Sequence, residues 1–178
     1  MTPSPQTHSP VDPAAPAVVV GSEPSAPERT SLLKGWVRTH IAYLLTGFGR
    51  TQQAGYVFVG LPIHDVWGRP GTHHRPDVCY ISVAKLPTLT DDDFVRVVPD
   101  LVVEVVSAED TVGDVEGRVF DYTMAGVKAV WLVYPAIKMC RVQYPDGTGR
   151  MLNITGTLDG GQALPGFTCP VVDLFPKT

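Results

Sequence analysis

The chain has 178 residues, of which 44% are hydrophobic and 18% charged, a composition that suits one globular domain with a buried core. No segment approaches the run of about 20 apolar residues that a membrane-spanning helix needs. Cys79, Cys140 and Cys169 are widely spaced and form no Cys-x-x-Cys pair, which argues against a zinc site and against a disulfide framework. The N-terminus has neither a basic region nor a long apolar segment, so we expect a cytoplasmic protein that does not associate with membranes.

The formal net charge of −4 is unfavourable for binding phosphate groups, but the charge is unevenly distributed. Residues 100–121 contain seven acidic side chains against the single base Arg118. Basic side chains dominate the earlier part of the chain: Arg29, Lys34, Arg38, His40, Arg50, Arg69, His73, His74 and Arg75. We therefore expect any contact with nucleic acid to come from the N-terminal half; the alternative is a dispersed, solvated surface charge.

The N-terminal segment differs in composition from the rest of the chain. Residues 1–28 are rich in Pro, Ala and Ser, which predicts an extended or mobile arm, followed by a single domain over residues 29–178. Apolar residues then recur at helical spacing over residues 29–48, which predicts an amphipathic helix packed on a sheet. Trp36 in this run, like Trp131 further on, is expected to be a core residue rather than a base-stacking platform.

The remaining chain alternates strand and helix patterns. We expect strands over 56–59, 75–81, 98–106, 129–134 and 140–144, a helix over 114–125, a turn at 145–147 and a closing segment at 164–167. The runs at 75–81 and 98–106 are expected to be antiparallel neighbours, and the helix to cross over to a parallel strand. This order predicts an α/β fold with a mixed central sheet flanked by helices.

Three histidines, His64, His73 and His74, lie in the segment 60–74, which we expect to be a loop. Their spacing matches no standard zinc pattern, and loop histidines are more often solvated than metal-bound. We therefore assign them no metal role.

Asp77 and Glu104 each lie within an otherwise apolar strand pattern, where a carboxylate is costly to bury unless it is paired or bound to a cation. If the register places Ala84 opposite Pro99, Glu104 faces Cys79, and Asp77 lies diagonally on the same face, within about 7–8 Å. Two such carboxylates form an all-oxygen site suited to Mg²⁺ or Mn²⁺. The alternative is that each makes an ordinary ion pair at a strand end.

Four motifs follow one another in the chain: Arg75-Pro76-Asp77, the run from Pro99 to Ser107 that contains Glu104, the run from Tyr122 to Val127 leading into Trp131-Leu132-Val133, and Leu164-Pro165-Gly166-Phe167. Together they resemble the Uma-two restriction endonuclease family of the PD-(D/E)xK nuclease superfamily, over about residues 17–176. The resemblance implies a restriction-endonuclease-like fold and metal-dependent hydrolysis of phosphodiester bonds.

The resemblance also implies roles for particular residues. Asp77 and Glu104 correspond to the metal-binding acids, with the backbone carbonyl of Val105 as a further ligand and Glu28 as the one candidate to complete the site. Arg118 stands where the family usually has a lysine on the crossover helix. A guanidinium can hold a phosphate but cannot act as a general base, and an ion pair with Asp114 on the helix surface is the structural alternative.

These residues leave three functions open. The first is a Mg²⁺- or Mn²⁺-dependent endonuclease, a hydrolase acting on DNA through Asp77, Glu104 and Arg118. The second is a nuclease-fold protein that binds nucleic acid or another protein without cleaving it. The third is an oligomeric regulatory scaffold, for example a homodimer, in which the two carboxylates serve only structural pairing.

Overall fold

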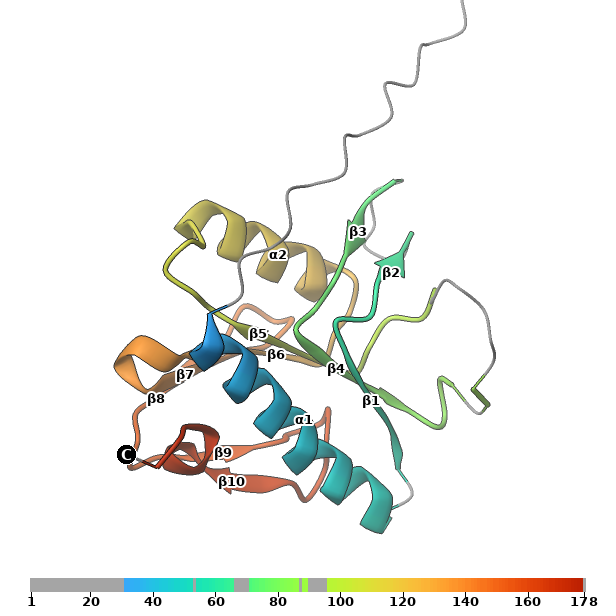
Figure 1. Cartoon of the computed structure of the whole chain (residues 1–178). Coiled ribbons are helices and arrows are strands. Elements are labelled where there is room, and N and C mark those ends of the chain that lie inside the picture. The colour runs from blue at the N-terminus through green and yellow to red at the C-terminus, as the bar shows by residue number, and fades with distance from the viewer. Residues whose placement is uncertain (1–30, 53, 66–70, 87, 90–95, 178) are drawn as a thin grey trace, which may run out of the picture.

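The structure is a computed structural model that describes residues 31–52, 54–65, 71–86, 88–89 and 96–177. Within these residues a six-stranded sheet runs in the order β1-β4-β5-β6-β7-β8, with helices α1 and α2 on opposite faces (Figure 1). The elements are α1 (Leu32–Gln52), β1 (Gly55–Val59), β4 (Val78–Ser82), β5 (Leu101–Val105), α2 (Val112–Met124), β6 (Ala129–Tyr134), β7 (Met139–Gln143) and β8 (Gly149–Leu152). The predicted arm at 1–28, which includes Glu28, lies outside the described residues.

The sheet is mixed, as the sequence predicted. β5 and β6 are parallel and are connected through α2, because a parallel pair needs a crossover long enough to return to the same end of the sheet. The other neighbours, β1 with β4, β4 with β5, β6 with β7 and β7 with β8, are antiparallel. The α/β fold class with a mixed central sheet is therefore confirmed.

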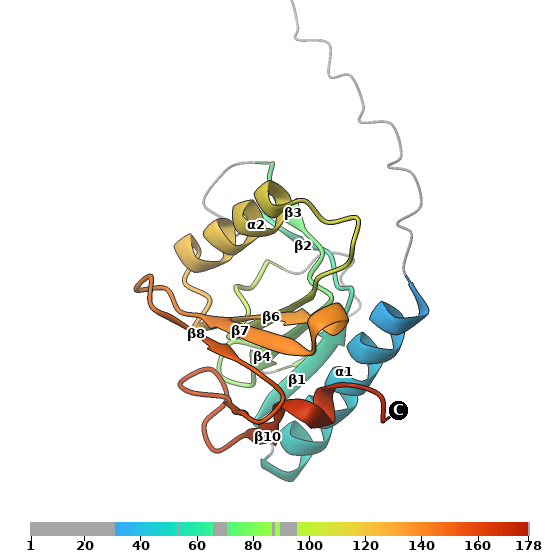
Figure 2. The same ribbon diagram turned by 90° about the vertical axis from the view of Figure 1, so that its left-hand side faces the viewer.

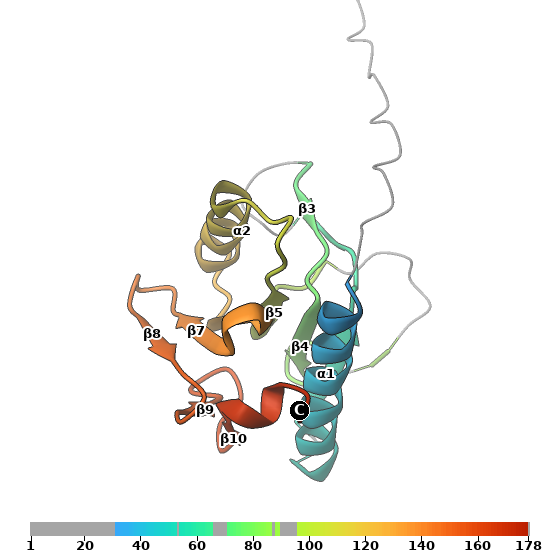
Figure 3. The ribbon, with the colours of Figure 1, turned by 60° about the vertical axis from the view of Figure 1, so that its left-hand side comes forward.

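Each face of the sheet has its own apolar core, because successive residues of a strand point to opposite faces. On one face Val37, Ile41 and Leu45 of α1 pack with Val103 and Trp131. On the other face Val115, Val119 and Tyr122 of α2 pack with Val102 and Leu132. Figures 2 and 3 show the sheet between the two helices, so the central strands β5 and β6 are covered on both sides.

The C-terminal part closes the core beside α1. It contains the ribbon of β9 (Thr157–Asp159) and β10 (Thr168–Pro170) and a short 3-10 helix, η2 (Val171–Leu174), which lies next to α1 in Figure 3. The ring of Phe167 meets Phe48 of α1 edge to face at 5.5 Å. None of the described helices, including the 21-residue α1, is apolar enough to cross a membrane.

Helix α1 differs from its prediction in extent and in the placement of Trp36. The helix runs from Leu32 to Gln52 instead of over 29–48, and its buried stripe contains Val37, Ile41 and Leu45. Trp36 points away from this stripe, is 43% exposed and stacks on His40 at 4.7 Å, so its prediction as a core residue is wrong. Trp131, in contrast, is buried in the core as predicted.

The histidine segment is a hairpin rather than a simple loop. β2 (Ile63–His64) pairs antiparallel with β3 (His73–His74), and the rings of His64 and His73 stack at 5.3 Å. Nε2 of His74 lies 2.9 Å from a carboxylate oxygen of Asp121 in α2. The expectation of solvated loop histidines is therefore wrong for His74, which ties the hairpin to α2.

Two glycines test how tightly the fold is packed. A Cβ on Gly55 would lie 2.3 Å from the carbonyl oxygen of Ile81 and 2.7 Å from the Tyr80 ring, whereas a Cβ on Gly117 of α2 would meet nothing within 4 Å. We expect Gly55→Ala to lower the free energy of unfolding by about 2 kcal/mol through overpacking. Gly117→Ala should raise it by about 0.5–1 kcal/mol, because alanine is the better helix former. Urea unfolding measures both, and equal effects of the two changes would contradict this packing.

Candidate active site

The candidate site lies where β4 begins and β5 ends. In the β4–β5 ladder Val78 pairs with Val103, Cys79 with Val102 and Tyr80 with Leu101. One further step in this register places Asp77 directly opposite Glu104. The predicted register was therefore wrong by two residues, a shift that keeps both side chains on one face of the sheet because the side-chain period is two.

Asp77 is buried, with 5% of its surface exposed, and both of its carboxylate oxygens have partners. Oδ2 accepts a hydrogen bond from the backbone N–H of Val105 at 2.8 Å and lies 3.4 Å from Nζ of Lys34. Oδ1 lies 3.6 Å from a terminal nitrogen of Arg38. Asp77 thus connects the end of β5 to the first two turns of α1.

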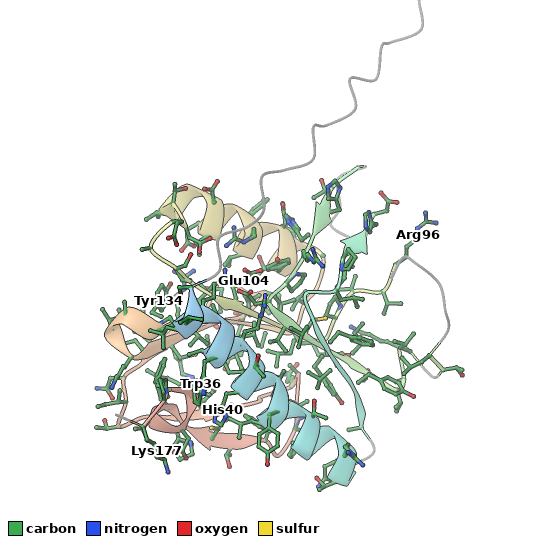
Figure 4. All side chains as sticks on the ribbon, viewed as in Figure 1. Trp36, His40, Arg96, Glu104, Tyr134 and Lys177 are labelled. Carbon is green, nitrogen blue, oxygen red and sulfur yellow. The ribbon has the colours of Figure 1, made fainter. Side chains whose placement is uncertain are left out.

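Glu104 is equally buried and faces α2. Its Oε1 accepts a 2.6 Å hydrogen bond from the hydroxyl of Tyr122, and its Oε2 lies 3.4 Å from Nε of Arg118. In Figure 4 it lies between α2 and the N-terminal turns of α1. Burial raises the pKa of Glu104 from 4.5 to about 7; Asp77 adds to the rise, while Arg118, Tyr122 and Lys34 oppose it.

Arg118 joins Glu104 to a third carboxylate. One of its terminal nitrogens donates to Oδ1 of Asp110 at 3.0 Å, in the loop between β5 and α2. Burial acts to raise the pKa of Asp110, but hydrogen bonds from Ser107 and from Arg118 outweigh it and lower the pKa overall. The alternative ion pair with Asp114 does not form, because Asp114 is bound to Thr111 at the start of α2. Arg118 therefore belongs to the site.

Lys34 and Arg38 also belong to this site, although sequence analysis counted them only among the basic residues of the N-terminal half. They lie one turn apart on α1, and Lys34 is only 5% exposed. A signal was present in the sequence, since Lys34 precedes Val37 and Ile41 on the same buried stripe. A lysine on the buried face of a helix is costly without a carboxylate partner, and Asp77 is that partner.

The residues present suit a hard divalent cation. The two opposed carboxylates supply oxygen donors of the kind that Mg²⁺ and Mn²⁺ prefer, and the end of β5 brings the backbone of Val105 against Asp77. In the described part of the chain, no three His, Cys, Asp or Glu side chains come together as a metal cluster. The assignment of Asp77, Glu104 and the Val105 carbonyl as metal ligands therefore remains a proposal.

Comparison with known sequences identifies the family. The model of the Uma2 family, described as "Putative restriction endonuclease", matches residues 26–172. The chain belongs to the Uma2 family. The resemblance found in the four sequence motifs is thereby confirmed, whereas a search of curated proteins finds no match.

A solved structure shares the fold of this Uma2 chain. It is described as a putative nuclease belonging to DUF820 from Anabaena variabilis, and it matches with a TM-score of 0.72 at 15% sequence identity. The match covers 84% of this chain and 83% of that one. The family and the fold together support a nuclease.

The raised pKa of Glu104 predicts a pH-dependent stability. Between pH 4.5 and about 7 the folded Uma2 chain keeps a proton on Glu104 that the unfolded chain has lost. The resulting stabilisation is fully present below pH 4.5 and is lost as the pH rises through about 7, a decrease of about 3 kcal/mol in the free energy of unfolding.

Glu104→Gln cannot ionise and should flatten this part of the profile. Urea unfolding of both proteins from about pH 4 to about pH 8 measures the difference. Parallel profiles would contradict a pKa raised by burial.

Proposed function

We propose that this Uma2 protein is a divalent-metal-dependent endonuclease that hydrolyses phosphodiester bonds in DNA. The observation that carries the proposal is the pair of buried carboxylates, Asp77 and Glu104, which lie opposite one another at the ends of neighbouring strands. Basic side chains from both helices contact them. Three buried free cysteines, Cys79, Cys140 and Cys169, are compatible with a reducing compartment, and we place the activity in the cytoplasm.

In this proposal Asp77, Glu104 and the carbonyl oxygen of Val105 hold Mg²⁺ or Mn²⁺. When bound, the cation supplies Lewis acidity for the attack of water on phosphorus. The Tyr122 hydroxyl fixes the orientation of Glu104, and the Val105 N–H fixes that of Asp77. Arg118 beside Glu104 holds the scissile phosphate and neutralises charge in the transition state, but its guanidinium cannot accept a proton from water.

A second function is favoured by one observation. The described carboxylate oxygens of Asp77 and Glu104 already contact Lys34, Arg38, Arg118, Tyr122 or the Val105 N–H, so the site is compensated without a cation. Such a protein would bind nucleic acid without cleaving it. Incubation of purified protein with plasmid DNA and either Mg²⁺ or Mn²⁺ separates the two functions, since only the endonuclease nicks or linearises the plasmid.

Removal of either carboxylate should weaken cation binding. We expect Asp77→Asn and Glu104→Gln each to reduce Mn²⁺ affinity roughly 10-fold or more, because each loses one anionic oxygen ligand. Isothermal titration measures the affinity, and thermal unfolding verifies that the variants fold. Asp100→Asn is the matched control, because Asp100 is also buried but pairs with Lys85 and Lys128 outside the site. Wild-type affinity in both site variants would remove the metal site from the proposal.

Exchange of Arg118 tests the catalytic step. We expect slow plasmid cleavage by the natural protein and a rate raised roughly 10-fold or more by Arg118→Lys, because a lysine in that environment can transfer a proton and an arginine cannot. Initial rates with Mg²⁺ and Mn²⁺ at equal protein concentration measure the change. Rapid wild-type cleavage that Arg118→Lys lowers would show instead that the arginine is the competent group.

A further inference from the structure

Helix α1 presents two cations to the candidate site and no anion of its own. From Leu32 to Gln52 the helix contains Lys34, Arg38 and Arg50 but no acidic residue. Lys34 and Arg38 are four positions apart, so both side chains project from one face of the helix toward Asp77. The helix therefore concentrates positive charge at the end of the sheet where Asp77 and Glu104 meet.

The hydrogen bonding of the two arginines is incomplete in the described structure. The side-chain Nε of Arg38 is buried and has no hydrogen-bond partner there, and the buried Nε of Arg118 makes only the 3.4 Å ionic contact with Oε2 of Glu104. A buried N–H donor without an acceptor costs about 1–3 kcal/mol, so such donors point to a ligand that supplies acceptors. The two arginines come from different helices, Arg38 from α1 and Arg118 from α2, and both lie against the carboxylate pair.

Counted over the printed contacts of the described residues, the charges around Asp77 and Glu104 balance before any cation binds. Asp77, Glu104 and Asp110, when ionised, contribute three negative charges, and Lys34, Arg38 and Arg118 contribute three positive ones. A divalent cation that binds to Asp77 and Glu104 adds two positive charges and competes with Lys34 and Arg38 for Asp77. The guanidinium of Arg38, whose Nε already has no hydrogen-bond acceptor in the described structure, then needs an anion, and a phosphodiester supplies both negative charge and acceptor oxygens.

We propose that Lys34 and Arg38 form a phosphate clamp: they hold Asp77 before a divalent cation binds and turn to the backbone phosphate of DNA when the cation takes Asp77. The proposal rests on the nuclease function proposed above and adds α1 to the substrate-binding machinery. The planar fork of Arg38 matches two phosphate oxygens, and Lys34 acts as a point charge beside it. With Arg118 on the other side, the clamp closes on the phosphate from both helices.

The first test measures DNA binding without cleavage. Fluorescence anisotropy of a labelled duplex and of a labelled single strand is recorded in Ca²⁺, with a gel to verify that the DNA stays intact. We expect Lys34→Met and Arg38→Gln each to weaken binding roughly 10-fold and to lower the salt dependence by about one phosphate contact. Arg50→Met, which removes a charge from the far end of the same helix, should change affinity less than about 2-fold.

The second test measures whether Lys34 holds Asp77 before a cation binds. Isothermal titration with Mn²⁺ should show tighter binding to Lys34→Met than to the wild type, because the cation no longer displaces an ammonium from Asp77. Lys34→Arg, which keeps the charge, serves as the variant that folds if Lys34→Met does not, and it should bind Mn²⁺ like the wild type. Thermal unfolding verifies each variant.

The two tests fail in different ways. DNA affinity that Lys34→Met and Arg38→Gln leave at the wild-type level, or that Arg50→Met lowers equally, overturns the clamp even if metal-dependent cleavage is found. Unchanged or weaker Mn²⁺ binding by Lys34→Met overturns the proposal that Lys34 and the cation compete for Asp77. A wild-type protein that binds DNA through Lys34 and Arg38 but binds no Mn²⁺ shows phosphate binding by α1, yet it overturns the exchange triggered by the cation and contradicts the metal-dependent nuclease.

Discussion

The burial of two facing carboxylates is the constraint on which the rest of the site depends. Asp77, just before β4, and Glu104 on β5 lie opposite one another, each 5% exposed, beside the mainly apolar side chains of these two strands. Two like charges that are buried close together repel one another and lose their hydration. The fold therefore needs positive charge or hydrogen-bond donors around both carboxylates. The helices supply them: α1 brings Lys34 and α2 brings Arg118 and the Tyr122 hydroxyl.

This compensation ties the two helices to the same point of the sheet. α1 covers one face and α2 the other, and their basic side chains meet at the end of β5. The hairpin of β2 and β3 is attached to α2 beside this point, because His74 contacts Asp121 and packs edge to face against the ring of Tyr122 at 5.2 Å. The orientation of Glu104 thus depends on packing well beyond its own strand.

The same arrangement suits phosphodiester chemistry better than purely structural pairing. A buried ion pair stabilises a fold weakly at best, since apolar residues can often replace it at little cost. Purely structural pairing therefore gives no reason to keep a buried donor without an acceptor. Here the buried Nε of Arg38 has no hydrogen-bond acceptor in the described structure, and Glu104 has a pKa raised to about 7 chiefly by burial. A site with an unused donor and a destabilised carboxylate is one that a cation and an anion together would complete.

The sequence by itself determined which chemistry to look for. Asp77 and Glu104 were recognisable because a charge in an apolar strand pattern is costly, and the crossover from β5 through α2 to β6 followed from the order of periodic segments. The register of β4 against β5 was not determined, because both strands are apolar and buried on both faces and their pattern does not choose between pairings. The predicted pairing kept Asp77 and Glu104 on one face but was displaced by two residues.

Only the tertiary structure decided which side of α1 faces the sheet. The helix has two stripes at helical spacing, one with Val37, Ile41 and Leu45 and the other with Leu33 and Trp36, and periodicity cannot choose between them. The sheet covers the first stripe, which leaves Trp36 exposed and carries Lys34 and Arg38 to Asp77. Two of the three cations of the site, Lys34 and Arg38, therefore came from a helix about 40 residues before Asp77 in the chain. A contact between residues so distant in sequence depends on how the helix packs, which local sequence pattern does not encode.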